Sequence, residues 1–426
     1  MRSLACGGAL LALGGCATYQ ASMQQVDQSL LAGNPAAALK ALKPMAGGRD
    51  QVLYLLNKAM ILRMQGDYAA SSDAFEQAKH LMNYLEGISV SENVAALSLT
   101  ENLRSFEGEL YDRLLLHVYL GLNYLQTGDA DSARVEVQQI DDLLKRLYPG
   151  TDAAPDGGDA FARYFSGLVY EDEGDWSDAM IAYRKAYQAY RAEGVADRNI
   201  PPDLQISLCR FADYLGLDQE RDDYKQRFGI ESWPPVLPAG GDPQGQLVFV
   251  LSNGLAPQKI AVTSVVQDPR SGHLFSISLP RLQPRAPSVS NASVAIDGQL
   301  ANTYQVESVA YDASRALAAE LPRLTAYEIS RNVARQAVAN QADKKEQGMG
   351  MLLSFIGTAV DQADTRIWNT LPDDIQLARL RLPPGKYELT VSLHGRNGNI
   401  VDNKSFDDVV IKPGRITFTA WHDVSY

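Results

Sequence analysis

The chain has 426 residues, enough for two domains that each bury a hydrophobic core. Its 46% hydrophobic and 21% charged residues are ordinary for a folded protein, so long disordered regions are not expected. The formal net charge is −12 and no cluster of lysines and arginines occurs, which argues against a nucleic-acid partner, because binding through phosphates needs a basic face.

The first twenty residues predict the compartment. Arg2 precedes a short apolar run that ends in Leu-Gly-Gly-Cys at residues 13–16. This run is too short to span a bilayer and has the shape of a secretory signal. Leu-Gly-Gly-Cys resembles the lipobox of bacterial lipoproteins, which implies that residues 1–15 are removed and that Cys16 is acylated. The position after Cys16 is Ala17 rather than aspartate, which in that class implies the outer membrane, facing the periplasm.

Two alternatives to lipidation remain: a plain signal peptide with an incidental cysteine, or a cytosolic apolar start. Removal of the signal also removes Cys6, so Cys209 is the one free thiol expected in a lipidated chain. No internal disulfide can then form, and stability must come from packing. Cys209 lies among apolar residues, where a buried, inert thiol is expected.

A glycine turn recurs through residues 16–230, each time between two runs whose apolar residues have helical spacing. The turn glycines are Gly33, Gly66, Gly128, Gly174 and, less clearly, Gly216. Small residues occupy two further positions of each unit, seven before the turn glycine (Ala59, Gly121, Gly167) and five after it (Ala38, Ser71, Ala133, Ala179). Such residues let two helices approach closely. The pattern resembles the tetratricopeptide repeat.

The later spacings between turn glycines exceed the tetratricopeptide period. Residues 149–158 are rich in proline, glycine and aspartate and predict a loop, which explains one excess. The other excess falls over residues 84–110, where we expect one additional helical hairpin. These insertions make a regular superhelix doubtful but leave the stacked hairpins in place.

The inner positions of the first helix in each hairpin are apolar: Leu53, Leu56, Met60, Leu115, Val118, Leu122, Phe161, Tyr164 and Leu168. An open groove of this kind would be a liability in water. One hypothesis is that the chain fills the groove itself, either with the additional hairpin or with its C-terminal half. The other is that these residues form the core between helices.

Residues 231–245 are rich in proline and glycine and predict a linker between a helical domain and a C-terminal domain at residues 246–426. Beyond the linker a period of two predicts strands. They are expected at residues 246–251, 259–263, 274–279, 289–296, 386–393, 400–406, 409–411 and 416–421. Residues 312–345 predict one long helix, which Pro322 should break or restart. The expected fold class is α+β and multidomain: a tetratricopeptide-like helical repeat domain, then a sandwich-like β-rich domain with one long helix.

No cofactor, metal ion or catalytic residue is predicted. The five histidines are isolated, and no zinc spacing, Walker loop, dinucleotide fingerprint or nucleophile elbow occurs. Asp364, Arg366 and Trp368 are the most site-like residues of the C-terminal half. Arginine with tryptophan can anchor a partner interface; alternatively, Asp364 and Arg366 can pair internally and fix the return from helix to strand.

A second charged cluster contains Glu107, Glu109, Asp112 and Arg113. Paired carboxylates can carry out glycoside hydrolysis, and the same residues can form an ion-paired helix face. Glu107, Glu109 and Arg113 join Asp364, Arg366 and Trp368 as candidate partner-binding residues.

The segments at residues 106–113, 120–125, 133–136, 252–257 and 364–372 together resemble a family of proteobacterial outer-membrane lipoproteins with tetratricopeptide-like helices and no assigned activity. The resemblance implies a non-enzymatic scaffold or adaptor in cell-wall or polysaccharide machinery. Its expected contacts are envelope proteins, through the helical repeats, and the membrane, through the lipid on Cys16. The alternative function is a peptidoglycan or glycan hydrolase that uses scattered carboxylates.

Overall fold

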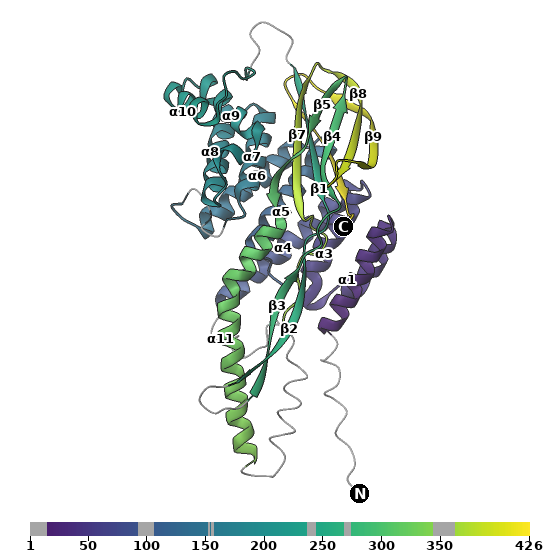
Figure 1. The fold of residues 1–426 in the computed structure, drawn as a ribbon, viewed down its shortest axis with the longest axis vertical. Helices are drawn as coiled ribbons and strands as arrows, with labels where there is room; N and C mark the ends of the chain where they lie inside the picture. The colour runs from purple at the N-terminus through teal and green to yellow at the C-terminus, as the bar shows by residue number, and fades with distance from the viewer. Residues whose placement is uncertain are drawn as a thin grey trace.

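The computed structural model describes residues 15–92, 106–151, 154, 157–236, 244–267, 274–343 and 363–426. Residues 1–14 of the predicted signal and residues 237–243 of the predicted linker lie outside these residues. Figure 1 shows a helical half packed beside a β-rich half, with α11 and the β2–β3 ribbon extending away from the strands of the other two sheets. None of the helices in the described ranges is long and apolar enough to cross a bilayer.

Helices α1 to α10 form five hairpins. Their bounds are α1 Gly15–Leu31, α2 Pro35–Leu42, α3 Gln51–Met64, α4 Tyr68–Glu92, α5 Leu110–Thr127, α6 Ala130–Leu147, α7 Ala160–Glu173, α8 Trp176–Ala192, α9 Pro202–Tyr214 and α10 Asp218–Phe228. Short 3-10 turns lie at Lys43–Met45, Gly48–Asp50 and Asp197–Asn199. Each predicted turn glycine has a positive φ, between 67° and 82°, a conformation that glycine adopts without strain.

The small residues before the turns are where helices meet, as predicted. A Cβ added to Gly167 of α7 would lie 2.3 Å from Cε1 of Tyr183 on α8, and one added to Gly121 of α5 would lie 2.9 Å from Cε1 of Phe165 on α7. Ala133 and Ala179 are fully buried. These close approaches confirm the repeat register, and the helical half has a tetratricopeptide-like fold.

One expectation about helices was wrong, and another is contradicted at its start and otherwise falls on residues outside the described ones. Helix α4 continues without a turn from Tyr68 to Glu92, so no hairpin begins near residue 84, because the apolar stripe of Phe75, Ala78 and Met82 keeps its helical spacing. Residues 93–105 lie outside the described residues. Helix α11 (Val309–Asp343) also continues through Pro322. Pro322 has no N–H, so the carbonyl of Ala318 receives no helical hydrogen bond from it. Both residues are exposed, so water can donate to that carbonyl instead.

The strands form two four-stranded sheets and one ribbon. The sheet orders are β10-β1-β7-β6 and β5-β4-β8-β9, and the ribbon is β2-β3. The bounds are β1 Gly245–Asn253, β2 Gln258–Gln267, β3 Leu274–Gln283, β4 Val289–Ile296, β5 Gln299–Asn302, β6 Tyr304–Ser308, β7 Asp374–Leu382, β8 Gly385–Gly395, β9 Ile400–Ile411 and β10 Ile416–Asp423. Strand β1 pairs in parallel with β10 and antiparallel with β7.

The sequence missed β5, β6 and β7, and it divided β9 into two strands. Strand β9 is continuous because a shift in its register with β8 absorbs an irregularity near Asp408, whose φ is +62°. Strand β7 was missed because Arg379 and Arg381 interrupt its apolar residues.

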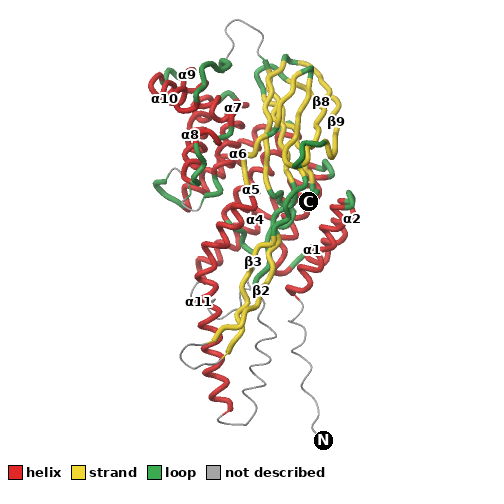
Figure 2. Tube along the Cα trace, viewed as in Figure 1, coloured by secondary structure: helices red, strands yellow, loops and turns green. Residues whose placement is uncertain are grey.

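Strand β1 serves two cores. Leu247, Phe249 and Leu251 face the second sheet, whereas Val248 and Val250 belong to the core that includes the helices. Figure 2 shows α7 to α10 on the left of the strands of the two larger sheets and α1 with α2 at the lower right. The β10-β1-β7-β6 sheet therefore has the second sheet on one face and the helical half on the other, which confirms an α+β fold with a sandwich-like C-terminal half.

The C-terminal half covers the apolar inner face of the helices. Phe165 of α7 contacts Phe418 of β10, with ring centroids 6.4 Å apart. The Tyr119 hydroxyl of α5 lies 3.0 Å from the Ser252 hydroxyl of β1. Tyr164, one of the predicted inner positions, meets this half, since its hydroxyl lies 3.5 Å from that of Tyr304 on β6. Phe165 and Tyr119 are neighbours of predicted positions, so the C-terminal half covers this side of α5 and α7, and for the other predicted positions both hypotheses stay predictions. Each fully buried large side chain here contributes about 1.5–3 kcal/mol.

Candidate functional site

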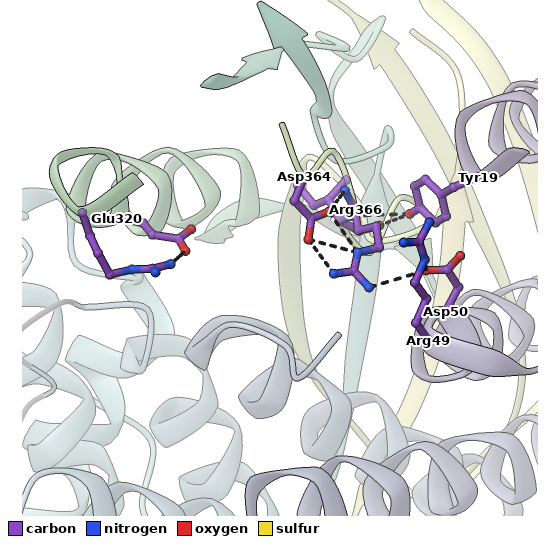
Figure 3. Close-up of polar contacts among 8 residues, drawn as sticks. Tyr19, Arg49, Asp50, Glu320, Asp364 and Arg366 are labelled. Atoms are coloured by element: carbon purple, nitrogen blue, oxygen red, sulfur yellow. Dashed lines mark hydrogen bonds and ion pairs between the residues drawn. The ribbon is translucent and has the colours of Figure 1, made fainter. Parts of the chain in front are cut away.

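The segment at residues 363–373, which contains three of the predicted site residues, lies in the seam between the two halves. Arg366 Nε is 2.9 Å from Asp364 Oδ1, and Arg366 Nη2 is 2.6 Å from Asp364 Oδ2. Asp50, before α3, lies 3.6 Å from Arg366 Nη1. Figure 3 shows Arg366 between these two carboxylates, with Tyr19 beside them. The arginine side chain is only 4% exposed.

Neighbouring residues fasten the same segment to the helices. The Tyr19 hydroxyl of α1 donates to the Ile367 carbonyl at 2.5 Å, and burial raises its pKa. Asn57 Oδ1 of α3 accepts from both the N–H and the hydroxyl of Thr370, at 3.1 and 2.9 Å. This segment therefore connects α1 and α3 to the start of β7.

Trp368 is fully buried against Phe75 of α4, with ring centroids 5.9 Å apart and the rings at 65°. A side chain inside the core has no surface to offer a partner. Of the two interpretations of Asp364, Arg366 and Trp368, the internal pair that fixes the return from helix to strand fits this geometry.

The Glu107–Arg113 cluster divides into separate contacts. Glu109 is the N-cap of α5: its side chain accepts from the third helical N–H, while the Asp112 carboxylate accepts from the Glu109 N–H at 3.0 Å. Arg113 turns to α4, where its Nη2 lies 2.6 Å from Glu86 Oε2. Glu107 precedes this cap and is half-buried.

Burial gives two of these carboxyl groups raised pKa values. Asp112 is fully buried, and desolvation raises its pKa to about 8. Desolvation also raises the pKa of Glu109, although Lys259 opposes this effect. The arrangement is that of a helix cap.

An ion network that the sequence did not predict joins the halves next to the apolar contacts. Glu171 of α7 pairs with Arg210 of α9 and with Arg379 of β7, and Gln246 of β1 donates to the same oxygen at 3.0 Å. Burial alone would raise the pKa of Glu171, but the two guanidinium groups outweigh it and hold the pKa at about 2. In the sequence, the signals that could have indicated this pair are Glu171 within an apolar helix and Arg379 within an apolar strand.

Asp172, next in α7, fixes the first residues of β10. Arg415 donates to both Asp172 oxygens, with Nε–Oδ1 and Nη2–Oδ2 distances of 3.0 and 2.6 Å. The backbone N–H of Ile416 donates to Asp172 Oδ1 at 2.5 Å. The Glu171–Asp172 doublet therefore binds three strands of one sheet, β1, β7 and β10.

A groove of about 790 Å³ lies beside Asp172 and Arg415. Its walls are the α5–α6 turn, the end of α7, and the facing parts of β9 and β10. Charged residues of its lining are Asp129, Asp131, Asp172, Glu173, Asp407, Asp408, Lys412 and Arg415. Both halves of the chain build this groove, and its lining is predominantly acidic.

A smaller cleft of about 240 Å³ lies between α4, α5 and α6 and is lined by His117. His117 Nδ1 is 2.7 Å from Glu136 Oε2, and Lys79 Nζ is 2.9 Å from Glu136 Oε1. His117 is thus a buried histidine whose ring nitrogen is satisfied by Glu136. Across the described ranges, no three His, Cys, Asp or Glu side chains are placed to hold a metal ion.

The two cysteines relevant to the sequence predictions lie in helices. Cys209 of α9 is buried, and desolvation raises the pKa of its thiol to about 11, which makes it a poor nucleophile. Cys16 lies in the first turn of α1, and its acylation stays a prediction.

Comparisons with known proteins give no family. No family model matches the chain, and no curated protein matches it. Among solved structures, MamA AMB-1 aligns with 13% identity and a TM-score of 0.29, covering 49% of this chain and 88% of its own. A tetratricopeptide repeat protein from Parabacteroides merdae aligns with 14% identity and a TM-score of 0.17, covering 49% of this chain and 89% of its own. The fold assignment therefore rests on the glycine turns, close helix approaches and sheet order described above.

Proposed function

We propose that this protein is a non-enzymatic adaptor that binds partner proteins of the cell envelope. The observation that carries the proposal is the composite acidic groove. It needs both halves, because the α5–α6 turn forms one wall and β9 with β10 form the other. A rigid seam holds these walls in place, since Glu171, Asp172 and the segment at residues 363–373 bind the halves together.

The proposal extends to the compartment. The lipobox-like sequence before Cys16 and the resemblance to proteobacterial outer-membrane lipoproteins support a lipid anchor and a position facing the periplasm. Cell-wall or polysaccharide machinery is the proposed setting of the partner.

Position-specific crosslinking in intact cells tests the adaptor role. A photoreactive amino acid would replace Asp131 or Asp407 in the groove, or Tyr214 or Tyr311 as exposed control positions elsewhere. We expect one shared partner band from both groove positions and none from the controls. Equal bands from all four positions, or none from any, would contradict an adaptor that works through this groove.

Cell fractionation tests the anchor. The natural chain should incorporate labelled palmitate and fractionate with the outer membrane, whereas Cys16→Ala should incorporate no label and be released from the membrane. A natural chain without label would refute lipidation.

A murein-release assay tests the hydrolase alternative. The natural chain, Glu107→Gln and Asp364→Asn should all leave purified peptidoglycan intact. Turnover by the natural chain that disappears in either folded variant would replace the adaptor by an enzyme.

A further inference from the structure

The free side of β10 is a sheet edge that opens into the groove. Strand β10 pairs with β1 on one side, and no described strand pairs with its other side. The groove lining includes four successive β10 residues, from Ile416 to Thr419. An edge with unpaired backbone groups is a template for another strand.

The register identifies which backbone groups face the groove. Gln246 of β1 donates to the Arg415 carbonyl at 3.0 Å, in a parallel ladder that places Gln246 opposite Ile416. In such a ladder one residue directs both its N–H and its C=O to one side of the strand, and the next residue directs both to the other side. Thr417 and Thr419 therefore bond to β1, whereas Ile416 and Phe418 direct their backbone groups to the free side.

Asp172 supports this assignment. Its carboxylate accepts the N–H of Ile416 at 2.5 Å, on the side away from β1. A carboxylate thus occupies the first donor position of the edge, where a neighbouring strand would place a carbonyl. The next donor along the free side is the N–H of Phe418. Its side chain is fixed against Phe165, which holds this part of the edge in place.

The charges beside this edge select the class of partner. Asp131 and Asp407 are exposed in the groove walls. Asp131 lies near enough to Arg415 to help raise the pKa of that guanidinium, but neither carboxylate is within ion-pair distance of a cation among the described residues. Asp172 and Asp408 are already paired with Arg415 and Lys386. The unpaired carboxylates favour lysine or arginine on a segment that enters the groove.

We propose that the groove binds an extended segment of a partner protein, which adds to β10 as a fifth strand and carries basic residues toward Asp131 and Asp407. This inference rests on the proposed adaptor function and specifies the chemistry of the partner. Backbone bonds to β10 supply strand geometry, while the two carboxylates supply charge selectivity. A second copy of this chain is disfavoured, because its net charge is −12 and its own groove is acidic.

A peptide titration with the full chain tests the inference. The probe is a fluorescent peptide of alternating lysine and valine, as long as β10, 8 residues. One control peptide has glutamate in place of lysine. Another keeps lysine but carries N-methyl groups on every second residue, so that the N–H groups of one strand edge, in turn either edge, cannot donate. Fluorescence anisotropy should show binding of the first peptide alone, and the binding should weaken as salt rises.

Two matched variants separate groove charge from overall charge. Asp131→Asn with Asp407→Asn should weaken binding by about 5-fold, as expected for two exposed charge contacts. Asp73→Asn with Asp223→Asn makes the same change in net charge at exposed positions outside the groove lining and should leave the affinity unchanged.

Residue-resolved amide exchange decides whether the peptide binds as a strand. On binding, exchange of the Phe418 amide should slow, while the Thr417 and Thr419 amides, already bonded to β1, should change little. Equal binding of the N-methylated peptide, an unchanged Phe418 amide, or self-association through the groove would overturn the inference. If groove crosslinks in cells persist after such a result, the adaptor function stands and the strand chemistry alone fails.

Discussion

Glu171 of α7 and Arg379 of β7, 208 residues apart in sequence, form a buried ion pair across the seam. Arg210 and Gln246 also contact the Glu171 carboxylate. An ion pair with 2% and 4% side-chain exposure costs much to break, because the remaining charge stays buried.

Glu171→Gln should therefore destabilise the protein by about 3–5 kcal/mol, since two guanidinium groups lose their carboxylate. Urea unfolding followed by tryptophan fluorescence measures the loss. Glu231→Gln is the matched control: it removes the exposed pair with Lys225 and should cost at most about 1 kcal/mol. Similar losses in both variants would show that the seam does not depend on the buried pair.

Asp112→Asn should remove part of the pH dependence of stability. The folded carboxyl keeps its proton up to a pH of about 8, whereas the unfolded one loses it near 3.8. Because the folded state binds more protons in that interval, stability falls as the pH rises from about 4 to about 8, by at most about 1.4 kcal/mol per pH unit from this group. The variant keeps an oxygen that can accept from the Glu109 N–H.

The measurement is the unfolding free energy of both proteins at several pH values from 4 to 8. Glu193, Asp312 and Asp373 also have raised pKa values, about 7, 6 and 6, but they are present in both proteins and their effects cancel in the difference. Parallel curves would mean that Asp112 ionises normally in the folded state.

Substitutions of Trp368 distinguish a packing role from a partner-binding role. Trp368→Ala should lose about 3–5 kcal/mol, because it leaves a cavity beside Phe75. Trp368→Phe keeps a ring there and removes a buried N–H that has no bonding partner, so the loss should be below about 1.5 kcal/mol. Denaturant unfolding gives both values. Wild-type stability in Trp368→Ala would contradict the buried position.

Gly167→Ala should destabilise the protein although alanine favours helices. The added Cβ would lie 2.3 Å from the Tyr183 ring, and we expect a loss of about 1–3 kcal/mol. Gly121→Ala places its Cβ 2.9 Å from the Phe165 ring edge and should cost less. Thermal unfolding ranks the two variants, and a stabilised Gly167→Ala would show that α7 and α8 can separate without cost.

Local patterns predicted the helical half well. Turn glycines such as Gly128 and close-approach glycines such as Gly167 act within one hairpin, so their spacing alone encodes the geometry. Strand β4 was predicted with its observed ends, because its residues alternate cleanly. Strand β7 was not, because Arg379 points into the seam to meet Glu171, and nothing near it in sequence announces that partner.

The candidate site was predicted less well. Arg366 and Trp368 have the composition of an interface anchor, and only the three-dimensional contacts place them inside the protein. The groove combines segments around residues 130, 172, 408 and 417, which no sequence spacing brings together. Free edges are a property of sheet order, and the parallel β1–β10 pairing that creates this one could not be inferred from strand patterns.

The parallel pairing of β1 with β10 also sets an order of events during synthesis. Ribosomes complete helices α1 to α10 and β1 well before residues 416–423 are synthesised. Phe165 and its neighbours therefore stay exposed until Phe418 can pack against them. A contact of such long sequence separation forms late and slowly. A chain that ends before residue 416 would lack the β10 wall of the groove, so the complete groove exists only in the finished protein.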